Sequence, residues 1–242
     1  MIEQLPLAVL PSQDFSFDNF VPGENWEALS RLMDCVPGSM LYLFGEPGSG
    51  KSHLLKALAA ERAATIYFAA ADFPTDLNAC LENQAQIVAV DDVQDLNEAQ
   101  QMTLFDLINY THRHKNQADA ISLISAGDQA PLNMPIREDL RNRLGWGLAY
   151  RLHSLKDEDI VLAIQQRAYE KDLKINSEAT DWLLKNTERN IRSLFAWLDA
   201  LDLYSIAKRR QVTLNLIKNF IQEAEINHHL WVSQQKHSPS SI

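Results

Sequence analysis

In the first part of the chain, apolar residues gather in short runs that alternate with longer amphipathic stretches. The short runs predict buried strands, at residues 40–44, 65–69, 87–90, 120–125 and 149–152. The amphipathic stretches predict helices, at residues 24–35, 53–60, 73–83 and 97–115. Strands and helices that alternate over short connections predict an α/β fold, in which a parallel sheet is covered on both faces.

From Lys156 onward the pattern predicts helices only. Four amphipathic stretches fit a small bundle, at residues 157–171, 177–186, 190–207 and 213–225. Helical periodicity places several large side chains on the buried faces of their helices, among them Trp26, Met33, Met102 and Ile206. We expect an α/β domain over 15–153 and a small all-α domain over 154–226, with flexible tails at 1–14 and 227–242.

Composition narrows the classes of function. The chain has 242 residues, of which 46% are hydrophobic and 22% charged, as in ordinary globular proteins. Its net charge of -10 disfavours binding of duplex DNA through bulk electrostatics. No apolar run is long enough to cross a bilayer and no signal peptide is recognisable, so we expect no membrane association and a cytoplasmic location. Two cysteines, Cys35 and Cys80, fit no metal-ligand spacing and are expected to be buried apolar side chains.

A glycine-rich segment, GEPGSGKS at residues 45–52, follows the first predicted strand and precedes a predicted helix. This spacing and context are typical of a phosphate-binding loop. Glycines let backbone N–H groups approach phosphate oxygens, the helix adds its positive end, and Lys51 reaches the β- and γ-phosphates. We expect nucleotide contacts from eight residues: Gly45, Pro47, Gly48, Ser49, Gly50, Lys51, Ser52 and His53.

Acidic residues at the ends of two predicted strands complete the expected site. Asp91 and Asp92 follow the run at 87–90, and Asp128 follows the run at 120–125. Ser52 and Asp91 would hold Mg²⁺, Asp91 through water, while Asp92 would polarise the attacking water. Asp128 is well placed to touch a γ-phosphate, because ligands bind beyond the carboxyl ends of parallel strands. Its alternative role is a turn or capping residue.

Two N-terminal segments each allow two interpretations. The aromatic stretch at residues 15–23 either anchors a loop through its phenylalanines or forms a wall for a nucleotide base. Residues 1–14 carry apolar side chains without a helical period. They either fold back onto the body of the protein or serve as a short docking peptide.

The motifs resemble those of the AAA+ ATPases, and more narrowly those of the bacterial replication initiator DnaA. The similar segments are FSFDNFVPG (15–23), GEPGSGKSHLL (45–55), IVAVDDVQ (87–94), SAGDQAP (125–131), LRNRLGWGL (140–148) and NIRSLFAWLDAL (190–201). The resemblance implies an AAA+ P-loop core followed by a helical lid. It also implies that Arg143 is an arginine finger acting in trans on nucleotide held by a neighbouring subunit, that Arg192 contacts nucleotide within its own subunit, and that Asp128 is the first sensor.

The sequence departs from DnaA in two ways. About seventeen residues follow the helix predicted at 213–225, too few for the helix-turn-helix domain of a complete DnaA. No Lys or Arg occurs between Arg62 and Arg113, where DnaA has basic residues that grip single-stranded DNA, so we expect no direct sequence-specific DNA binding. In both respects the chain resembles the Hda group of DnaA-related regulators. Hda proteins dock on the sliding clamp through a peptide of the form Q-L-x-L-x-L, to which Gln4, Leu5, Leu7 and Val9 are similar.

The resemblance implies one function and leaves two alternatives. It implies a regulator of replication initiation that binds ADP or ATP with Mg²⁺, docks on the DNA polymerase III sliding clamp (its beta subunit) and stimulates hydrolysis of DnaA-bound ATP. The expected partners are therefore DnaA and the clamp, and self-association stays open. The alternatives are a stand-alone AAA+ ATPase or helicase loader that turns over its own nucleotide, and a clamp adaptor with no effect on hydrolysis.

Overall fold

The computed structural model describes residues 15–81, 85–117, 119–187 and 191–223. These residues form two compact units, Phe15–Lys156 and the residues from Asp157 onward. The clamp-like residues Gln4, Leu5, Leu7 and Val9 lie outside the described residues, so their role stays a prediction. No helix within the described ranges is both long and apolar enough to span a bilayer.

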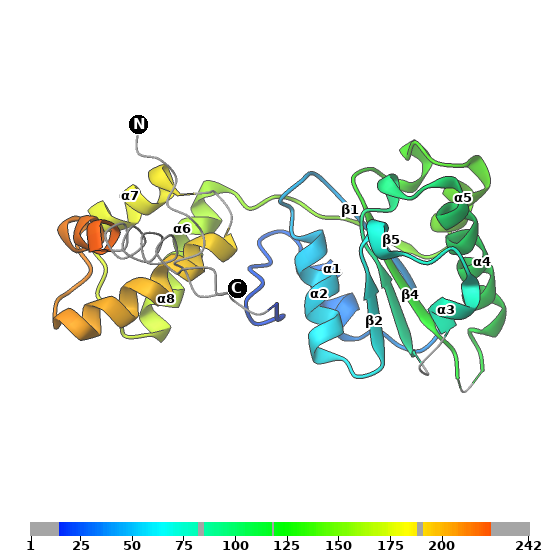
Figure 1. The fold of residues 1–242 in the computed structure, drawn as a ribbon, viewed down its shortest axis with the longest axis horizontal. Coiled ribbons are helices and arrows are strands. Elements are labelled where there is room, and N and C mark those ends of the chain that lie inside the picture. The colour runs from blue at the N-terminus through cyan, green and yellow to red at the C-terminus, as the bar shows by residue number, and fades with distance from the viewer. Residues whose placement is uncertain (1–14, 82–84, 118, 188–190, 224–242) are drawn as a thin grey trace, which may run out of the picture. The chain divides into compact units, whose positions relative to one another are not determined.

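A five-stranded parallel sheet forms the centre of the first unit (Figure 1). Its strands are β1 (Met40–Phe44), β2 (Thr65–Phe68), β3 (Ile87–Val90), β4 (Ser122–Gly127) and β5 (Leu148–Arg151), in the spatial order β2-β3-β4-β1-β5. All four strand pairs are parallel, and each strand lies at or next to its predicted run. The predicted fold class is confirmed.

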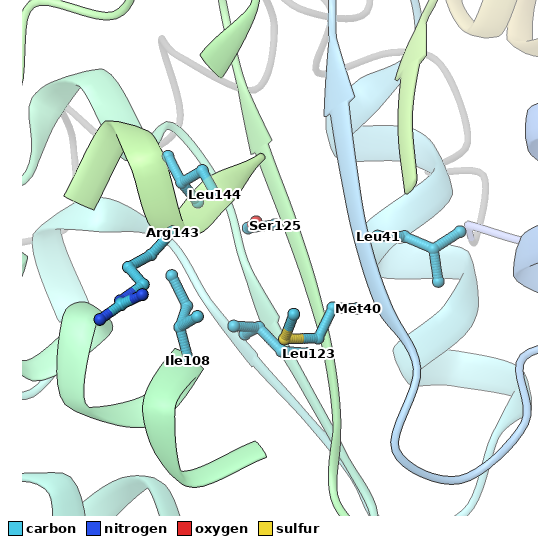
Figure 2. Close-up of a pocket in the computed structure, with 7 residues that line it drawn as sticks. All are labelled: Met40, Leu41, Ile108, Leu123, Ser125, Arg143 and Leu144. Carbon is cyan, nitrogen blue, oxygen red and sulfur yellow. The ribbon is translucent and has the colours of Figure 1, made fainter. Parts of the chain in front are cut away.

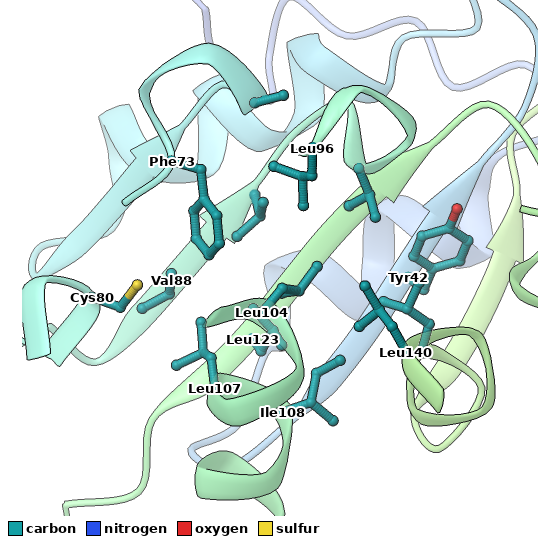
Figure 3. Packing of buried hydrophobic residues seen from close by; sticks show 14 of the residues in the cluster. Tyr42, Phe73, Cys80, Val88, Leu96, Leu104, Leu107, Ile108, Leu123 and Leu140 are labelled. Atoms are coloured by element: carbon teal, nitrogen blue, oxygen red, sulfur yellow. The ribbon is translucent and has the colours of Figure 1, made fainter. Parts of the chain in front are cut away.

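Helices cover both faces of this sheet (Figure 1). On one face lie α1 (Trp26–Met33) and α2 (Lys51–Glu61), and on the other lie α3 (Leu77–Leu81), α4 (Glu98–His114) and α5 (Glu138–Leu144). Alternate residues of the strands serve the two cores, since Leu41 and Leu43 face α1 and α2 whereas Tyr42 faces α4 and α5. Figure 3 shows the second core, where side chains of α3, α4 and α5 meet Tyr42, Val88 and Leu123. The central strands β1, β3 and β4 are buried between the two layers of helices, which explains why β1 and β3 are continuously apolar.

Short 3-10 turns connect the strands to the helices near the sheet's carboxyl end. They are η2 (Ala70–Asp72), η4 (Val93–Asp95) and η5 (Pro131–Asn133). A capping box starts α4, because Asn97 and Gln100 exchange side-chain to backbone hydrogen bonds of 2.9 and 3.0 Å. The Gln100 amide also donates to the carbonyl oxygens of Ala70 and Phe73. This one side chain therefore joins the loop after β2 to the loop after β3.

Helix faces were partly mispredicted in the first unit. Trp26 and Met102 are 66% and 53% exposed, and Met33 is exposed as well. The buried side of α1 centres on Ala28, Leu29 and Leu32, and that of α4 includes the polar Gln100, Thr103 and Thr111. Where small or polar side chains form part of the buried face of a helix, the positions of the large apolar side chains alone predict a neighbouring face to be buried. Cys80 is buried as predicted, whereas Cys35 is only partly buried.

The second unit is all-helical. It contains α6 (Asp157–Glu170), α7 (Ser177–Asn186) and α8 (Ile191–Lys208), and residues 214–223 are also helical. Trp197 of α8 makes edge contacts with Trp182 of α7 and with Phe220, so aromatic rings join three of the helices. Asp199 of α8 pairs with Lys171 at 2.8 Å and with Arg167 at 3.5 Å. The prediction for Ile206 was wrong, because that side chain is 66% exposed.

Candidate functional site

The segment between β1 and α2 has the backbone of an anion-binding loop. Gly48 and Gly50 have φ values of 82° and 96°, a region that L side chains rarely adopt. A Cβ atom on Gly50 would lie 2.6 Å from Cε2 of Phe20, whereas one on Gly48 would meet no atom within 4 Å. Gly50 is thus required both by its conformation and by the ring packed against it. The open side of the loop lies at Gly48.

Lys51, the first residue of α2, turns back over this loop. Its ammonium Nζ donates to the carbonyl oxygens of Gly45 and Glu46, at 2.7 and 3.0 Å. An ammonium has three N–H donors, so two are used within the loop. The pKa of Lys51 is lowered, because burial outweighs the attraction of Asp91, Asp92 and Asp128. One buried cation and three acidic side chains therefore lie near one another at the end of the sheet.

The loop fits a phosphate group. The hydroxyl Oγ of Ser49 is buried and has no hydrogen-bond partner among the described residues, so it offers polar capacity that an anion would use. Backbone N–H groups at the start of α2 add the positive end of a helix. Ser52, the second residue of α2, and Asp91 supply only oxygen donors, the type that Mg²⁺ prefers. We conclude that the predicted loop residues can hold a nucleotide phosphate with Mg²⁺.

Asp91 is the more buried of the two acids after β3, with 1% of its surface exposed. Its Oδ1 accepts the backbone N–H of Asp92 at 3.0 Å, and its Oδ2 accepts the hydroxyl of Tyr67 at 3.0 Å. A buried carboxylate is stable only where donors satisfy its oxygens in this way. The side chain is therefore held in one orientation at the end of the sheet.

Asp92 and Asp128 are joined by Gln94, whose role the sequence pattern does not reveal. Asp92 has a left-handed backbone (φ 53°), which is uncommon outside glycine and concentrates at functional sites. The Gln94 amide donates to Asp92 Oδ1 at 3.2 Å, and its Oε1 accepts the backbone N–H of Asp128 at 3.2 Å. The ends of β3 and β4 are thus tied together at the two acids expected to touch attacking water and γ-phosphate.

Arg143 lies in α5 and faces α4. Its guanidinium carbon is 3.7 Å from the ring centroid of Trp146 and 5.5 Å from that of Phe105. In Figure 2 the side chain extends from α5 toward the helix that carries Ile108. The pocket drawn there is lined by packing residues of β1, β4, α4 and α5 and includes none of the phosphate loop. Arg143 therefore contacts an aromatic ring of α4 and the ring of Trp146, just beyond the end of α5. Among the described residues it makes no hydrogen bond or ion pair with the phosphate loop of its own chain.

The remaining predicted residues are placed as follows. His53 contacts the rings of Phe15 and Phe20, and its Nε2 lies 2.8 Å from the carbonyl oxygen of Ser16. The aromatic segment thus anchors itself on α2, while a contact with a base stays a prediction. Arg192 is the second residue of α8, and its side chain lies outside the described part of the chain.

Three further residues belong to the site or its surroundings: Tyr67, Gln94 and Trp146. Gln94 and Trp146 lie inside motifs that the sequence analysis quoted, at IVAVDDVQ and LRNRLGWGL. Tyr67 lies in an ordinary apolar strand, where sequence pattern gives no sign of a hydrogen bond to Asp91.

Comparison with known families decides the assignment. The family model described as "Hda, lid domain" matches residues 157–221. The model described as "Bacterial DnaA ATPAse domain" matches residues 12–151, more than half of the chain. The chain belongs to the Hda and DnaA-related AAA+ family. As an AAA+ protein it has the expected parallel sheet and helical lid, and the predicted resemblance is confirmed.

Several known proteins are similar to this AAA+ protein in sequence or in fold. An uncharacterised protein of Haemophilus influenzae is 31% identical over 233 residues, which cover 91% of this chain and 99% of that protein. Domain III of the Thermotoga maritima replication initiation protein DnaA has a similar fold, with a TM-score of 0.62, 23% identity, and coverage of 87% and 99%. A replication initiator DnaA bound to AMPPCP and single-stranded DNA gives a TM-score of 0.62 at 24% identity. That match covers 78% of this chain and 65% of the initiator's.

Proposed function

We propose that this chain is a regulator of replication initiation that binds an adenine nucleotide, docks on the sliding clamp and stimulates hydrolysis of ATP held by DnaA. The membership in the Hda and DnaA-related family supports the regulatory role. The observation that carries the trans-acting role is the position of Arg143, whose guanidinium stacks on Trp146 just beyond α5. Within the described parts of the chain, Arg143 makes no hydrogen bond or ion pair with its own phosphate loop. A guanidinium with that placement is available to a second protein's nucleotide.

The phosphate loop supports nucleotide binding by this chain itself. Lys51 would move a donor from the loop carbonyls to the β- and γ-phosphates, and Ser49 would donate its unpartnered hydroxyl. Ser52 and Asp91 would hold Mg²⁺, which when bound neutralises charge on the phosphate oxygens. AMPPCP in a DnaA of the same fold supports an adenine base. We expect the purified protein to carry ADP.

A role beside DnaA and the clamp implies a cytoplasmic location for this protein.

The test of the proposed function is a single-turnover assay of DnaA·ATP. The purified protein, the clamp loaded on DNA and DnaA carrying labelled ATP are combined, and the conversion to ADP is followed. We expect hydrolysis to accelerate only when both the protein and the loaded clamp are present. A rate equal to that of DnaA alone would contradict the proposal.

A role for residues 1–9 in clamp docking is the second part of the proposal. We expect deletion of residues 1–9, or replacement of Gln4 and Leu5 by Ala, to abolish retention of the protein on immobilised clamp. A glutamine and spaced leucines on a short peptide can fill a preformed pocket at little entropic cost. Replacement of Glu3 by Ala in the same peptide is the matched control. If the protein that lacks residues 1–9 is still retained on the clamp, this segment is not needed for clamp docking.

Proton linkage at Lys51 gives a further prediction. A bound phosphate raises a lysine pKa that burial lowers in the free protein, so the charged form is the one that binds. We expect nucleotide affinity to be constant while free Lys51 is charged, and to fall as alkaline pH rises through its lowered pKa, by up to about tenfold per pH unit. Calorimetry in buffers of different ionisation enthalpy should then record proton uptake on binding. An affinity independent of pH across the alkaline range would contradict this linkage.

A stand-alone ATPase is the second candidate, because Asp91, Asp92 and Asp128 lie close enough to Lys51 to attract its charge. Steady-state hydrolysis by the purified protein alone separates the two functions. Turnover without DnaA that disappears in an Asp92→Asn variant would favour the ATPase.

A further inference from the structure

Tyr67 lies on β2, the neighbour of β3, and Asp91 directly follows β3. Tyr67 is the third residue of β2 and pairs in register with Ala89 of β3, two positions before Asp91. Its ring runs along the sheet toward the carboxyl end of β3, where the hydroxyl donates to Asp91 Oδ2 at 3.0 Å. A phenylalanine at this position would fill the same space without the hydrogen bond. The hydroxyl is therefore the part of Tyr67 that contacts the candidate nucleotide site.

The Asp91 carboxylate is held from two sides. Tyr67 donates to one oxygen and the Asp92 backbone N–H donates to the other, so rotation of the carboxylate would break one or both bonds. Each carboxylate oxygen has about two lone-pair sites, so each can still accept a further donor such as a metal-bound water. The two bonds fix the direction in which the remaining lone pairs point.

The Tyr67 ring is itself held by α2. Lys56 of α2 has its Nζ 5.4 Å from the centroid of this ring and 5.0 Å from that of Phe15. Tyr67 also packs against the core formed by α1, α2 and one face of the sheet. The helix that begins at Lys51 thus fixes Tyr67, and Tyr67 fixes Asp91. One chain of contacts relates the phosphate loop to the acid on the neighbouring strand.

We propose that Tyr67 is a positioning residue, which holds Asp91 in the orientation that accepts a Mg²⁺-bound water and so sets how much Mg²⁺ adds to nucleotide affinity. This inference rests on the proposed nucleotide site. A residue that only stabilised the fold would change affinity by the same factor with and without Mg²⁺.

The experiment measures the dissociation constant of ADP by calorimetry, once with MgCl₂ and once with EDTA. The dissociation constant in EDTA divided by that in MgCl₂ gives the factor by which Mg²⁺ strengthens binding. This ratio is compared between the wild-type protein and Tyr67→Phe. We expect Tyr67→Phe to lower this ratio by about tenfold, the lower end of the value of a hydrogen bond to a charged group. Affinity in EDTA should change little. Thermal unfolding of each protein confirms that the comparison is made on folded protein.

Two further variants make the result specific. Tyr150→Phe removes a hydroxyl from β5, the opposite edge of the same sheet, and should leave the ratio unchanged. In an Asp91→Asn background, Tyr67→Phe should have no further effect, because the residue acts through Asp91.

The other outcomes overturn the inference in distinguishable ways. An unchanged ratio in Tyr67→Phe, or equal losses with Mg²⁺ and EDTA, would leave Tyr67 with a structural role only. Wild-type protein that binds ADP equally well in both conditions would overturn the inference and leave nucleotide binding intact. Wild-type protein that binds no ADP would contradict the proposed nucleotide site itself.

Discussion

Replacement of Arg143 by Ala should reduce the stimulation of DnaA-bound ATP hydrolysis by at least about a hundredfold. An arginine delivered to a γ-phosphate neutralises charge that develops in the transition state, and such residues contribute roughly 10³–10⁵ in rate. The guanidinium of Arg143 lies over the rings of Trp146 and Phe105. Arg143 is half-buried and its cation–π contacts contribute about 0.5–2 kcal/mol, so the variant should remain folded.

The control for this variant lies on the same helix. Arg141→Ala removes the same charge from α5, two residues away, and should keep most of the stimulation. The readout is the single-turnover conversion of labelled ATP on DnaA, with the clamp loaded on DNA. If Arg143→Ala stimulates as well as the wild-type protein, Arg143 is not the trans-acting residue. If both variants lose stimulation equally, the charge of α5 serves docking rather than catalysis.

Replacement of Lys51 by Ala should weaken nucleotide binding by at least about a hundredfold. The variant loses the buried ammonium that faces the loop, and a charge-assisted bond to phosphate is among the strongest single contacts available. The loss can be measured as the thermal shift that ADP produces. Ligand at 100 times its dissociation constant stabilises a protein by about 2.7 kcal/mol, and Lys51→Ala should lose most of that gain.

Lys115→Ala is the matched control for Lys51→Ala. Lys115 is exposed at the end of α4, so its removal changes the net charge equally without touching the loop. Both variants should unfold at similar temperatures without nucleotide. A full ADP-induced shift in Lys51→Ala would show that the glycine-rich loop is not where nucleotide binds.

The sequence predicted the sheet, the loop and the acids because each depends on local pattern. GEPGSGKS is continuous, and Asp91 and Asp128 follow apolar runs that can only be strands between helices. Helix faces were less predictable. On α4 the buried stripe contains Gln100, whose amide is satisfied by two carbonyl oxygens from a distant loop, so polarity gives the wrong face.

The partners of the site residues were not predictable at all. Tyr67 and Gln94 reach the acids from a neighbouring strand and from a 3-10 turn, and such contacts depend on strand order rather than on spacing. The same holds for Trp146, whose stacking on Arg143 needs α5 to end at Gly145. The functions of Arg192 and of residues 4–9 stay predictions, and the deletion of residues 1–9 tests the second of them.

The bridge made by Gln94 has an energetic consequence. Because one amide group bonds both to the Asp92 side chain and to the Asp128 backbone, neither acid can shift without altering the other's surroundings. Substitutions at the two positions will therefore not contribute independent free energies, since residues that share a partner are thermodynamically coupled. A nucleotide that displaces Asp128 at the end of β4 would therefore also change the hydrogen bonding of Asp92 after β3, through this single glutamine.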